Sequence, residues 1–303
     1  MTDPTVESMH HLDELESEAI FVIREGVAQF RRPCLLFSGG KDSAVLAHLV
    51  RAAYHPAPIP FPFVHIDTGH NFPETMEFRD RTVSALGVHL IIGSVQESID
   101  RGRVAEDQTA SDRNALQSVT LLDTILAHGF DAAFGGARRD EEKARAKERF
   151  FSHRDASGKW SPENQRPELW NLFNGRHSPG EHFRIFPISN WTEADVWNYI
   201  RCRGIALPAL YFAHERPVVW RNGSWVPVSP WIRLGPDERP EVRKVRFRTC
   251  GDITISGALE SKAVDAEAVI RELRTLSRDE RGGRLDDRKS ETAMEDRKRS
   301  GYF

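Results

Sequence analysis

Between Pro33 and Tyr54 the chain changes from a short apolar run to an amphipathic segment through Ser-Gly-Gly-Lys-Asp-Ser, residues 38–43. The apolar run, residues 34–37, is typical of a strand that is buried on both faces of a parallel sheet. From Ser43 onward, apolar residues recur at helical spacing and form one face. Six residues between a strand and a helix leave room only for a tight turn. The sequence therefore predicts an α/β fold with a parallel sheet.

This turn has the composition of a phosphate-binding loop. The two glycines, Gly39 and Gly40, let the backbone approach a ligand closely, and the start of a helix presents unpaired N–H groups and a positive dipole end. The turn lacks the spacing of the Walker loop, which places a first glycine four residues before Gly-Lys-Ser/Thr. An ordinary diglycine turn is the alternative. The predicted phosphate-binding residues are Ser38, Gly39, Gly40, Lys41, Asp42 and Ser43.

A second loop follows the next predicted strand, residues 63–66, and reads Asp67-Thr68-Gly69. In open parallel sheets, ligands bind at the carboxyl ends of the strands, where this loop would lie beside the first one. Asp67 could bond a ribose or hold a magnesium ion, or it could cap the helix predicted at residues 73–86. The spacing alone leaves both roles open. Gly87 is expected to end that helix.

A third loop follows the predicted strand at residues 130–134 and begins with Gly135 and Gly136. Arg138 and Arg139 come next, and arginine presents a rigid donor fork that matches phosphate or sulfate. We therefore expect these two arginines to bind an anion, with the glycines allowing close approach. Farther along, Glu141 and Arg145 have the i,i+4 spacing of a solvated helical ion pair.

Composition limits the class of protein. The 303 residues carry 42 Lys+Arg against 45 Asp+Glu, a net charge of −3, which gives no reason to expect nucleic-acid binding. No apolar run approaches the roughly 18–20 residues that would cross a membrane, and the N-terminus lacks the pattern of a signal peptide. The three cysteines form no CxxC pair, as expected in a reducing compartment. We expect a cytoplasmic protein with no membrane partner.

The pattern divides the chain into residues 1–210 and a smaller region, residues 211–303. In the larger part, residues 94–114 are expected to be irregular, either a flap over the site or a solvated excursion. Residues 152–182 are expected to form a connection before the last strand. Asn222-Gly223 predicts a hairpin turn in the smaller region. A basic strand, residues 243–248, could contact a nucleotide, a partner or water. The last 27 residues, with 15 charges, are expected to be disordered or to order on a partner.

Residues 38–43 resemble the pyrophosphate loop (PP-loop) of enzymes that split ATP between its α and β phosphates. Taken with other stretches, the chain closely resembles the small-subunit family of bacterial sulfate adenylyltransferase (ATP sulfurylase subunit 2, the CysD type). One departure is Thr249-Cys250-Gly251-Asp252-Ile253-Thr254, where many members carry Gly-Cys-Trp-Pro. The matching stretches are residues 38–43, 65–69, 130–149, 164–171, 189–193, 245–249 and 299–303.

The resemblance implies an open parallel sheet of the adenine-nucleotide α-hydrolase type, with helices on both faces. It implies the reaction of ATP with sulfate to adenosine 5′-phosphosulfate and pyrophosphate, with Mg²⁺, in sulfate assimilation and cysteine biosynthesis. It also implies a heterodimer with a GTPase subunit (CysN, alone or fused to adenylylsulfate kinase) that carries the GTP and binds residues 211–303. The metal ligands are unknown.

The same resemblance suggests roles for the candidate residues. Ser38, Gly39, Gly40 and Ser43 would hold the β- and γ-phosphates, and Lys41 would neutralise charge on the leaving group. Asp67, Thr68 and Gly69 would line the nucleoside side. Arg138 and Arg139 would hold sulfate or the α-phosphate. No general base is required, because sulfate is already an anion.

Two other functions are weighed against this one. A phosphoadenylylsulfate reductase shares the loop but needs a nucleophilic cysteine near its C-terminus, and here the last cysteine is Cys250, followed by Gly-Asp. The second alternative is a non-catalytic, nucleotide-sensing scaffold for the GTPase, which the sequence leaves open.

Overall fold

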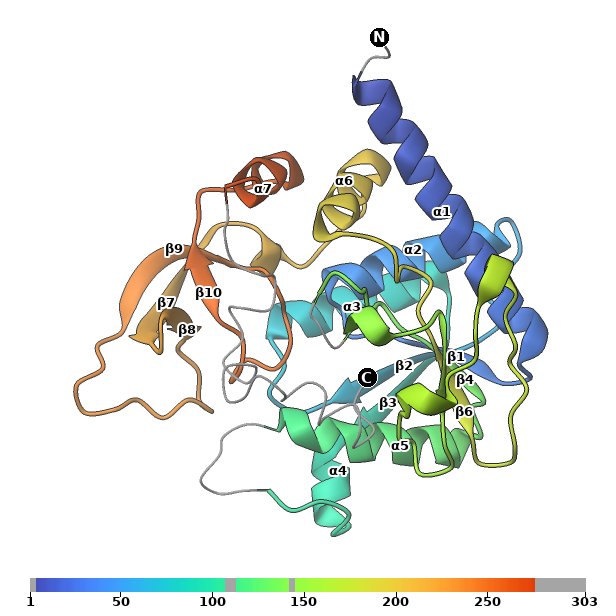
Figure 1. Cartoon of the computed structure of the whole chain (residues 1–303). Helices are drawn as coiled ribbons and strands as arrows, with labels where there is room; N and C mark the ends of the chain where they lie inside the picture. Colours follow the sequence, from blue (N-terminus) through green and yellow to red (C-terminus); the bar gives the residue numbers. More distant parts are fainter. Residues whose placement is uncertain (1–3, 107–112, 142–144, 276–303) are drawn as a thin grey trace.

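The computed structural model describes residues 4–106, 113–141 and 145–275 and contains a six-stranded sheet and a small closed barrel (Figure 1). The strand order in the sheet is β3-β2-β1-β4-β6-β5. Neighbouring strands pair in parallel except β5, which runs antiparallel to β6. The strands are β1 (Pro33–Leu36), β2 (Phe63–Asp67), β3 (Leu90–Ser94), β4 (Ala132–Phe134), β5 (Phe151–Arg154) and β6 (His182–Ile185).

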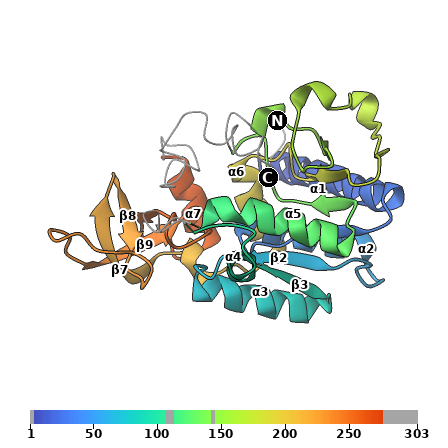
Figure 2. The same cartoon turned by 90° about the horizontal axis from the view of Figure 1, so that it is seen from below.

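Helices cover both faces of this sheet, as predicted (Figures 1 and 2). One face carries α1 (Pro4–Gln29), α2 (Lys41–Tyr54), α3 (Pro73–Leu86) and α6 (Glu193–Arg203), and the other carries α5 (Gln117–His128) with the short α4 (Val95–Asp100) beside it. Both faces of β1 are buried: Leu35 belongs to the core under α1 and α2, and Cys34 to the core under α5. This two-sided burial explains the continuous apolar run at residues 34–37.

Local signals in the sequence placed several boundaries correctly. Gly87 and Gly204 end α3 and α6 in the left-handed conformation that glycine adopts without strain. Thr192 and Asp195, a pair with capping-box spacing, form a capping box at the start of α6. In the larger part, one α-helix and one strand were missed. A six-residue helix, α4, lies within the segment expected to be irregular, and β5 lies at the start of the expected connection.

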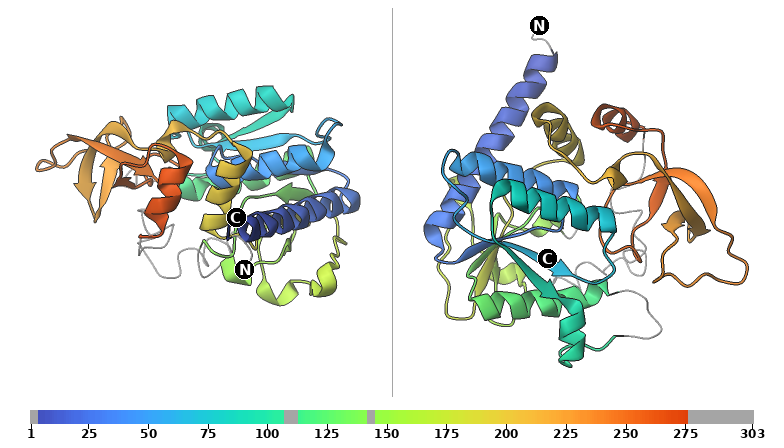
Figure 3. Two further views of the ribbon diagram at one scale, coloured as in Figure 1. Left: turned by 90° about the horizontal axis from the view of Figure 1, so that it is seen from above. Right: turned by 180° about the vertical axis from the view of Figure 1, so that it is seen from behind.

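The smaller region folds into a four-stranded closed barrel in the order β10-β8-β7-β9, followed by α7 (Ala266–Leu273). Asn222 and Gly223, with φ of 51° and 75°, form the predicted hairpin turn. Figure 3 shows this barrel beyond the ends toward which β2 and β3 point. The barrel strands are β7 (His214–Arg221), β8 (Ser224–Pro227), β9 (Glu241–Phe247) and β10 (Ala258–Glu260).

Three further expectations concern membrane spans, the domain division and the C-terminal tail. Among the residues described, no helix is long and apolar enough to cross a membrane. A division into separate domains at residue 210 stays a prediction. The expectation of a disordered tail concerns residues 277–303, which lie outside the described residues.

Two buried histidines make the fold sensitive to acid. Burial lowers the pKa of His65 to about 4, and burial together with the cations of Arg184 and Arg154 lowers the pKa of His182 to about 2. Both values lie below the 6.5 of an unfolded histidine, so the unfolded chain takes up protons first. Their contribution to stability is therefore complete above pH 6.5 and is lost as the pH falls below 6.5, toward 4 for His65 and toward 2 for His182.

We expect the free energy of unfolding to fall by roughly 2 kcal/mol for each histidine between pH 7 and pH 5, since one pKa unit corresponds to about 1.4 kcal/mol. Urea titrations at both pH values measure this fall. A His65→Gln variant should lose about half of the dependence. An equally steep fall in that variant would show that His65 contributes none of it.

Candidate active site

One pocket lies at the carboxyl ends of β1, β2 and β4, where a segment of the smaller region closes its rim. Its empty volume is about 1240 Å³, part of it open to solvent. It is lined by residues of the 38–43 turn, the end of β2, Gly135 and Gly136, and Thr249 to Asp252. This is the edge of the sheet where the sequence predicted a site.

The turn at residues 38–43 has the tight geometry that its glycines suggested. Gly39 has a φ of +77°, and a Cβ atom there would lie 2.7 Å from Thr75 Cγ2. Gly40 is the N-cap of α2 and offers no capping side chain. Its N–H donates to Ser38 Oγ at 3.3 Å, and Ser43 Oγ donates to its carbonyl at 2.9 Å. The serines thus hold the turn at the start of α2.

Tyr211 completes this turn from a distant part of the sequence. It lies in the short 3-10 helix Ala209–Tyr211, and its buried hydroxyl accepts the Lys41 N–H at 2.9 Å. Burial raises the pKa of Tyr211 well above its ordinary value, so the hydroxyl stays neutral. No sequence pattern near Tyr211 signalled this contact, because the two residues are 170 positions apart.

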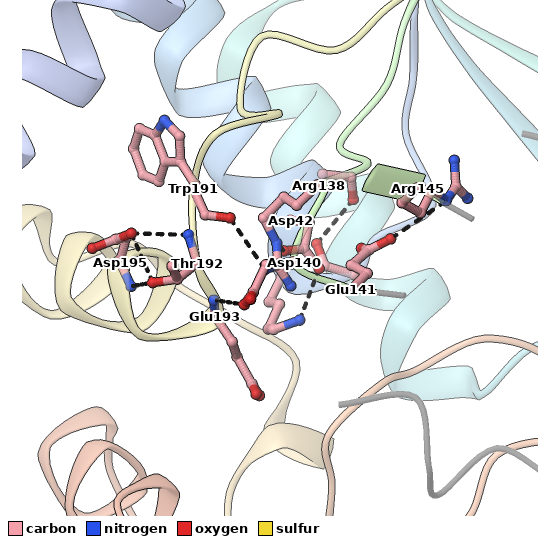
Figure 4. A network of polar contacts seen from close by, with 12 residues as sticks. Asp42, Arg138, Asp140, Glu141, Arg145, Trp191, Thr192, Glu193 and Asp195 are labelled. Carbon is pink, nitrogen blue, oxygen red and sulfur yellow. Dashed lines mark hydrogen bonds and ion pairs between the residues drawn. The ribbon is translucent and has the colours of Figure 1, made fainter. Parts of the chain in front are cut away.

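Asp42 lies at the centre of a buried ionic cluster (Figure 4). Lys41 Nζ lies 2.8 Å from Asp42 Oδ2, and Arg138 Nε lies 2.9 Å from Oδ1. Arg138 also donates through Nη1 to the carbonyl of Trp191 at 3.5 Å. The side chains of Lys41 and Arg138 are 1% and 0% exposed, whereas that of Asp42 is 20% exposed and lines the pocket. The cluster ties the turn to the segments after β4 and β6.

Further polar contacts continue from this cluster to the smaller region. Asp140, whose Oδ2 is 3.7 Å from Arg138 Nη1, accepts the N–H of Glu193 at the start of α6. The Glu193 carboxylate in turn pairs with Arg248, just after β9. Arg246, in the same basic strand, is buried and pairs with Glu272. These two arginines therefore hold the fold together and do not simply face water.

Arg139 points to other partners. Its Nε donates to the Glu148 carbonyl at 3.1 Å, its Nη1 donates to Asn190 Oδ1, and its guanidinium lies over the ring of Phe150. Neither Arg138 nor Arg139 lines the pocket. Sulfate binding by these two arginines stays a prediction.

Gly135 and Gly136 both line the pocket, and Gly136 also packs closely against the phosphate-binding turn. A Cβ atom at Gly136 would lie 3.0 Å from the Asp42 carbonyl carbon. The close approach at Gly136 is therefore to the backbone of the turn. A ligand role for either glycine remains untested.

The loop after β2 is organised by its own side chains. Asp67 Oδ1 accepts the Gly69 N–H at 2.7 Å and the Asn71 amide at 3.0 Å. The N-cap of α3 is Phe72, so the alternative in which Asp67 caps this helix is wrong. Thr68 is buried, and its carbonyl accepts a hydrogen bond from Arg113. Asn71 lines the pocket, and a nucleoside role for residues 67–69 stays a prediction.

The segment from Thr249 to Asp252, which departs from the resembled pattern, forms one wall of the pocket. The backbone of Asp252 bridges to Asn71, and the Ile253 N–H donates to the His70 carbonyl at 2.8 Å. Asp252 Oδ1 accepts hydrogen bonds from the N–H and hydroxyl of Thr254. Sequence reasoning left the role of this segment open, and the structure makes it part of the site.

Cys250 lines the pocket, but its thiol is unsuited to nucleophilic chemistry. Burial raises its pKa to about 12, so the thiolate is nearly absent at neutral pH. Cys34 is buried and has the same elevated pKa of about 12, whereas Cys202 is exposed.

We expect iodoacetamide at pH 8 to alkylate Cys202 in the native protein and to leave Cys34 and Cys250 unmodified, as peptide mass spectrometry would show. Rapid alkylation of Cys250 would contradict this and would revive the reductase alternative.

The burial of Arg145 shows that one prediction from the sequence is wrong. The spacing of Glu141 and Arg145 suggested a solvated helical pair, but Arg145 is 3% exposed and lines the pocket. It begins a short 3-10 helix, Arg145–Lys147, and its Nε lies 3.7 Å from a carboxylate oxygen of Glu141. Sequence reasoning could not distinguish Arg145 from the other cations of the charged run, of which Lys147 and Arg149 are exposed.

The pocket offers few ligands to a metal ion. Within the described residues, no group of three or more His, Cys, Asp or Glu side chains is placed to hold one. Asp42, Glu141 and Asp252 line the pocket individually. Mg²⁺ in nucleotide sites is usually held by one or two carboxylates together with substrate phosphates, and this pocket fits that requirement.

A parallel sheet whose first strand leads through a diglycine turn into a helix, with a pocket at that turn, defines the PP-loop class of nucleotide-binding α/β proteins. Residues 32–258 match the family model of the phosphoadenosine phosphosulfate reductase domain. The chain belongs to the family of sulfate adenylyltransferase subunit 2, and it is therefore a nucleotidyltransferase subunit.

Two relatives illustrate this membership, and one solved structure shows a similar fold. A sulfate adenylyltransferase subunit 2 from Mycobacterium sp. (strain KMS) is 55% identical over 99% of this chain and 97% of its own length. That of Streptomyces lavendulae is 54% identical over 97% and 92%. The crystal structure of Candida glabrata FMN adenylyltransferase in complex with ATP aligns with a TM-score of 0.51 at 16% identity, covering 94% of this chain and 91% of that one. This last likeness shows the shared fold.

Proposed function

We propose that this chain is the catalytic subunit that transfers the adenylyl group of ATP to sulfate, giving adenosine 5′-phosphosulfate and pyrophosphate. The observation that carries the proposal is the diglycine turn at the pocket of a chain that is 55% identical to sulfate adenylyltransferase subunits 2. A phosphate–sulfate anhydride is less stable than the bond it replaces, so the reaction needs a second, favourable reaction coupled to it. We propose GTP hydrolysis on a partner GTPase subunit for this role.

In this proposal the turn at residues 38–43 binds the β- and γ-phosphates. Ser38, Gly40, Asp42 and Ser43 line the pocket at the start of α2, where the turn would contact the leaving group. Lys41 supplies positive charge beside it. Holding the reactants in line and stabilising the charge that develops on pyrophosphate are sufficient catalysis when the nucleophile is already an anion.

The buried cluster around Asp42 positions this turn. Asp42 holds Lys41 and Arg138 at once, so the charge beside the phosphates is fixed by contacts from two other segments. Arg138 is therefore proposed to act through Asp42 in positioning the turn. Asp67, Thr68 and Gly69 are proposed to bound the nucleoside side of the pocket.

Magnesium is proposed to accompany ATP. Glu141 is the pocket carboxylate that would hold it together with phosphate oxygens. When bound, Mg²⁺ would supply charge neutralisation to the phosphates.

The smaller region is proposed to carry the partner contact. It lies beyond the pocket edge of the sheet and contributes Cys250 and Asp252 to the pocket wall. A GTPase bound there could alter the pocket through this wall or through the contacts from Arg248 to Arg138 by way of α6.

The test is to co-purify the chain with the GTPase subunit from the same cell and to measure adenosine 5′-phosphosulfate formed from ATP and sulfate, with and without GTP. We expect formation that depends on GTP. The same assay distinguishes the scaffold alternative, in which GTP is hydrolysed while no phosphosulfate or pyrophosphate is released. That outcome would remove the proposed catalytic role.

A further inference from the structure

Resting on the proposed function, we infer that Arg145 is the residue that binds the sulfate. Its guanidinium would donate hydrogen bonds to the oxygens of this tetrahedral dianion in the pocket that it shares with the phosphate-binding turn. Neither the family model nor the names of the relatives assign a role to this side chain.

The first observation is the lack of hydrogen bonds around a buried cation. Arg145 is 3% exposed, and within the described part of the chain its Nε and Nη1 atoms, both buried, have no hydrogen-bond acceptor. Its ionic contact with Glu141 is 3.7 Å long, beyond normal hydrogen-bond reach. Buried donors without acceptors are costly and uncommon, so their presence at a pocket indicates a missing acceptor.

The second observation is the contrast with the two arginines that the sequence favoured. Arg138 donates to Asp42 and Trp191, and Arg139 to Glu148 and Asn190. These guanidiniums are outside the pocket lining, whereas Arg145 is within it. An anion could reach Arg145 without breaking any of these bonds.

The third observation is the charge behind Arg145. The buried Arg154 pairs with Glu148, and the charge of Arg145 is among the causes that lower the Arg154 pKa. Arg184, also buried, interacts with the same Arg154. Arg154 thus repels two other buried arginines, with Glu148 and Asp155 as its carboxylate partners, and a dianion at Arg145 would relieve part of this repulsion.

The reaction also needs a second anion site. A sulfate oxygen must attack the α-phosphorus from the side opposite the leaving pyrophosphate, forming the S–O–P bond as the Pα–O–Pβ bond breaks. Because the turn would hold the departing phosphates, sulfate requires separate donors in the same pocket. Arg145 lies between β4 and β5, outside the turn, and arginine matches oxyanions better than lysine does.

The test compares Arg145→Gln and Arg145→Lys with Arg149→Gln in the co-purified complex. Arg149 is the matched control, because it lies in the same charged run but is exposed. We expect Arg145→Gln to raise the KM for sulfate about 10- to 100-fold, the usual loss for a charge-assisted hydrogen bond. The KM for sulfate of Arg145→Lys should lie between those of the wild type and Arg145→Gln. The KM for ATP should stay within about twofold of the wild type. A change in the KM values for both ATP and sulfate would indicate a general loss of the fold.

An unchanged sulfate KM in Arg145→Gln would overturn the inference. So would loss of ATP binding in both Arg145 variants, which would show that the residue maintains the pocket. If the wild-type complex forms no phosphosulfate, the proposed function fails by itself. In that case, calorimetric titration of sulfate into the complex with α,β-methylene ATP still decides the inference: binding that Arg145→Gln abolishes supports it, and binding that is absent or unaffected overturns it.

Discussion

Replacing Gly39 with alanine is expected to lower the kcat/KM for ATP by about 100-fold or more while the protein still folds. The φ of Gly39 is +77°, a conformation that costs other residues roughly 1–2 kcal/mol. The added Cβ atom would also lie 2.7 Å from Thr75 Cγ2 and 3.2 Å from the Thr75 carbonyl oxygen. The turn would have to shift, and a displacement of about 1 Å in a positioning element can cost about 100-fold in rate.

Gly87→Ala is the matched control for this prediction. Gly87 has a similar φ of +63° at the end of α3, but a Cβ atom there would meet nothing within 4 Å. The backbone strain is therefore similar and the steric clash is absent. We expect Gly87→Ala to lower stability by roughly 1 kcal/mol and to leave ATP binding unchanged. Equal ATP affinity in the two variants, measured by calorimetry, would contradict a phosphate-binding role for the turn.

Replacing Asp42 with asparagine is expected to have the largest effect on stability, a loss of about 3–5 kcal/mol. The substitution keeps the size of the side chain and removes the charge that Lys41 and Arg138 share. Arg138 would then lose its close contact with this carboxylate and keep the longer one with Asp140, whose Oδ2 lies 3.7 Å from Arg138 Nη1. Breaking a buried ion pair from one side is costly because a charge is left without compensation.

Urea unfolding of the purified chain measures the Asp42→Asn effect, and ATP binding should weaken with it because the turn loses its anchor. Asp123→Asn is the control: Asp123 accepts two hydrogen bonds from Arg103, an equally good pair that lies on the surface. We expect that variant to match the wild type within error, since exposed pairs contribute little. An Asp42→Asn protein as stable as the control would show that the cluster does not hold the turn.

The different partners of the three arginines after β4 could not be predicted from the sequence. Arg138, Arg139 and Arg145 belong to one charged run, and nothing in their spacing distinguishes a cation that binds Asp42 from one that lines the pocket. The i,i+4 spacing of Arg145 to Glu141 predicts a solvated pair, as is usual in a charged run. The partners of a long side chain depend on which segments fold against it, and the neighbouring residues in the sequence do not determine which segments these are.

The sequence alone was enough to identify the strand–turn–helix unit with its two glycines, the glycines that end α3 and α6, and the Asn-Gly hairpin. Each of these depends on the conformational preference of one or two residues, which acts locally. Only the tertiary structure brought Tyr211 and residues 249–252 to the turn, closed the barrel and buried Arg145. Those results depend on packing between segments up to about 200 positions apart, where burial and partner choice are decided by the whole fold.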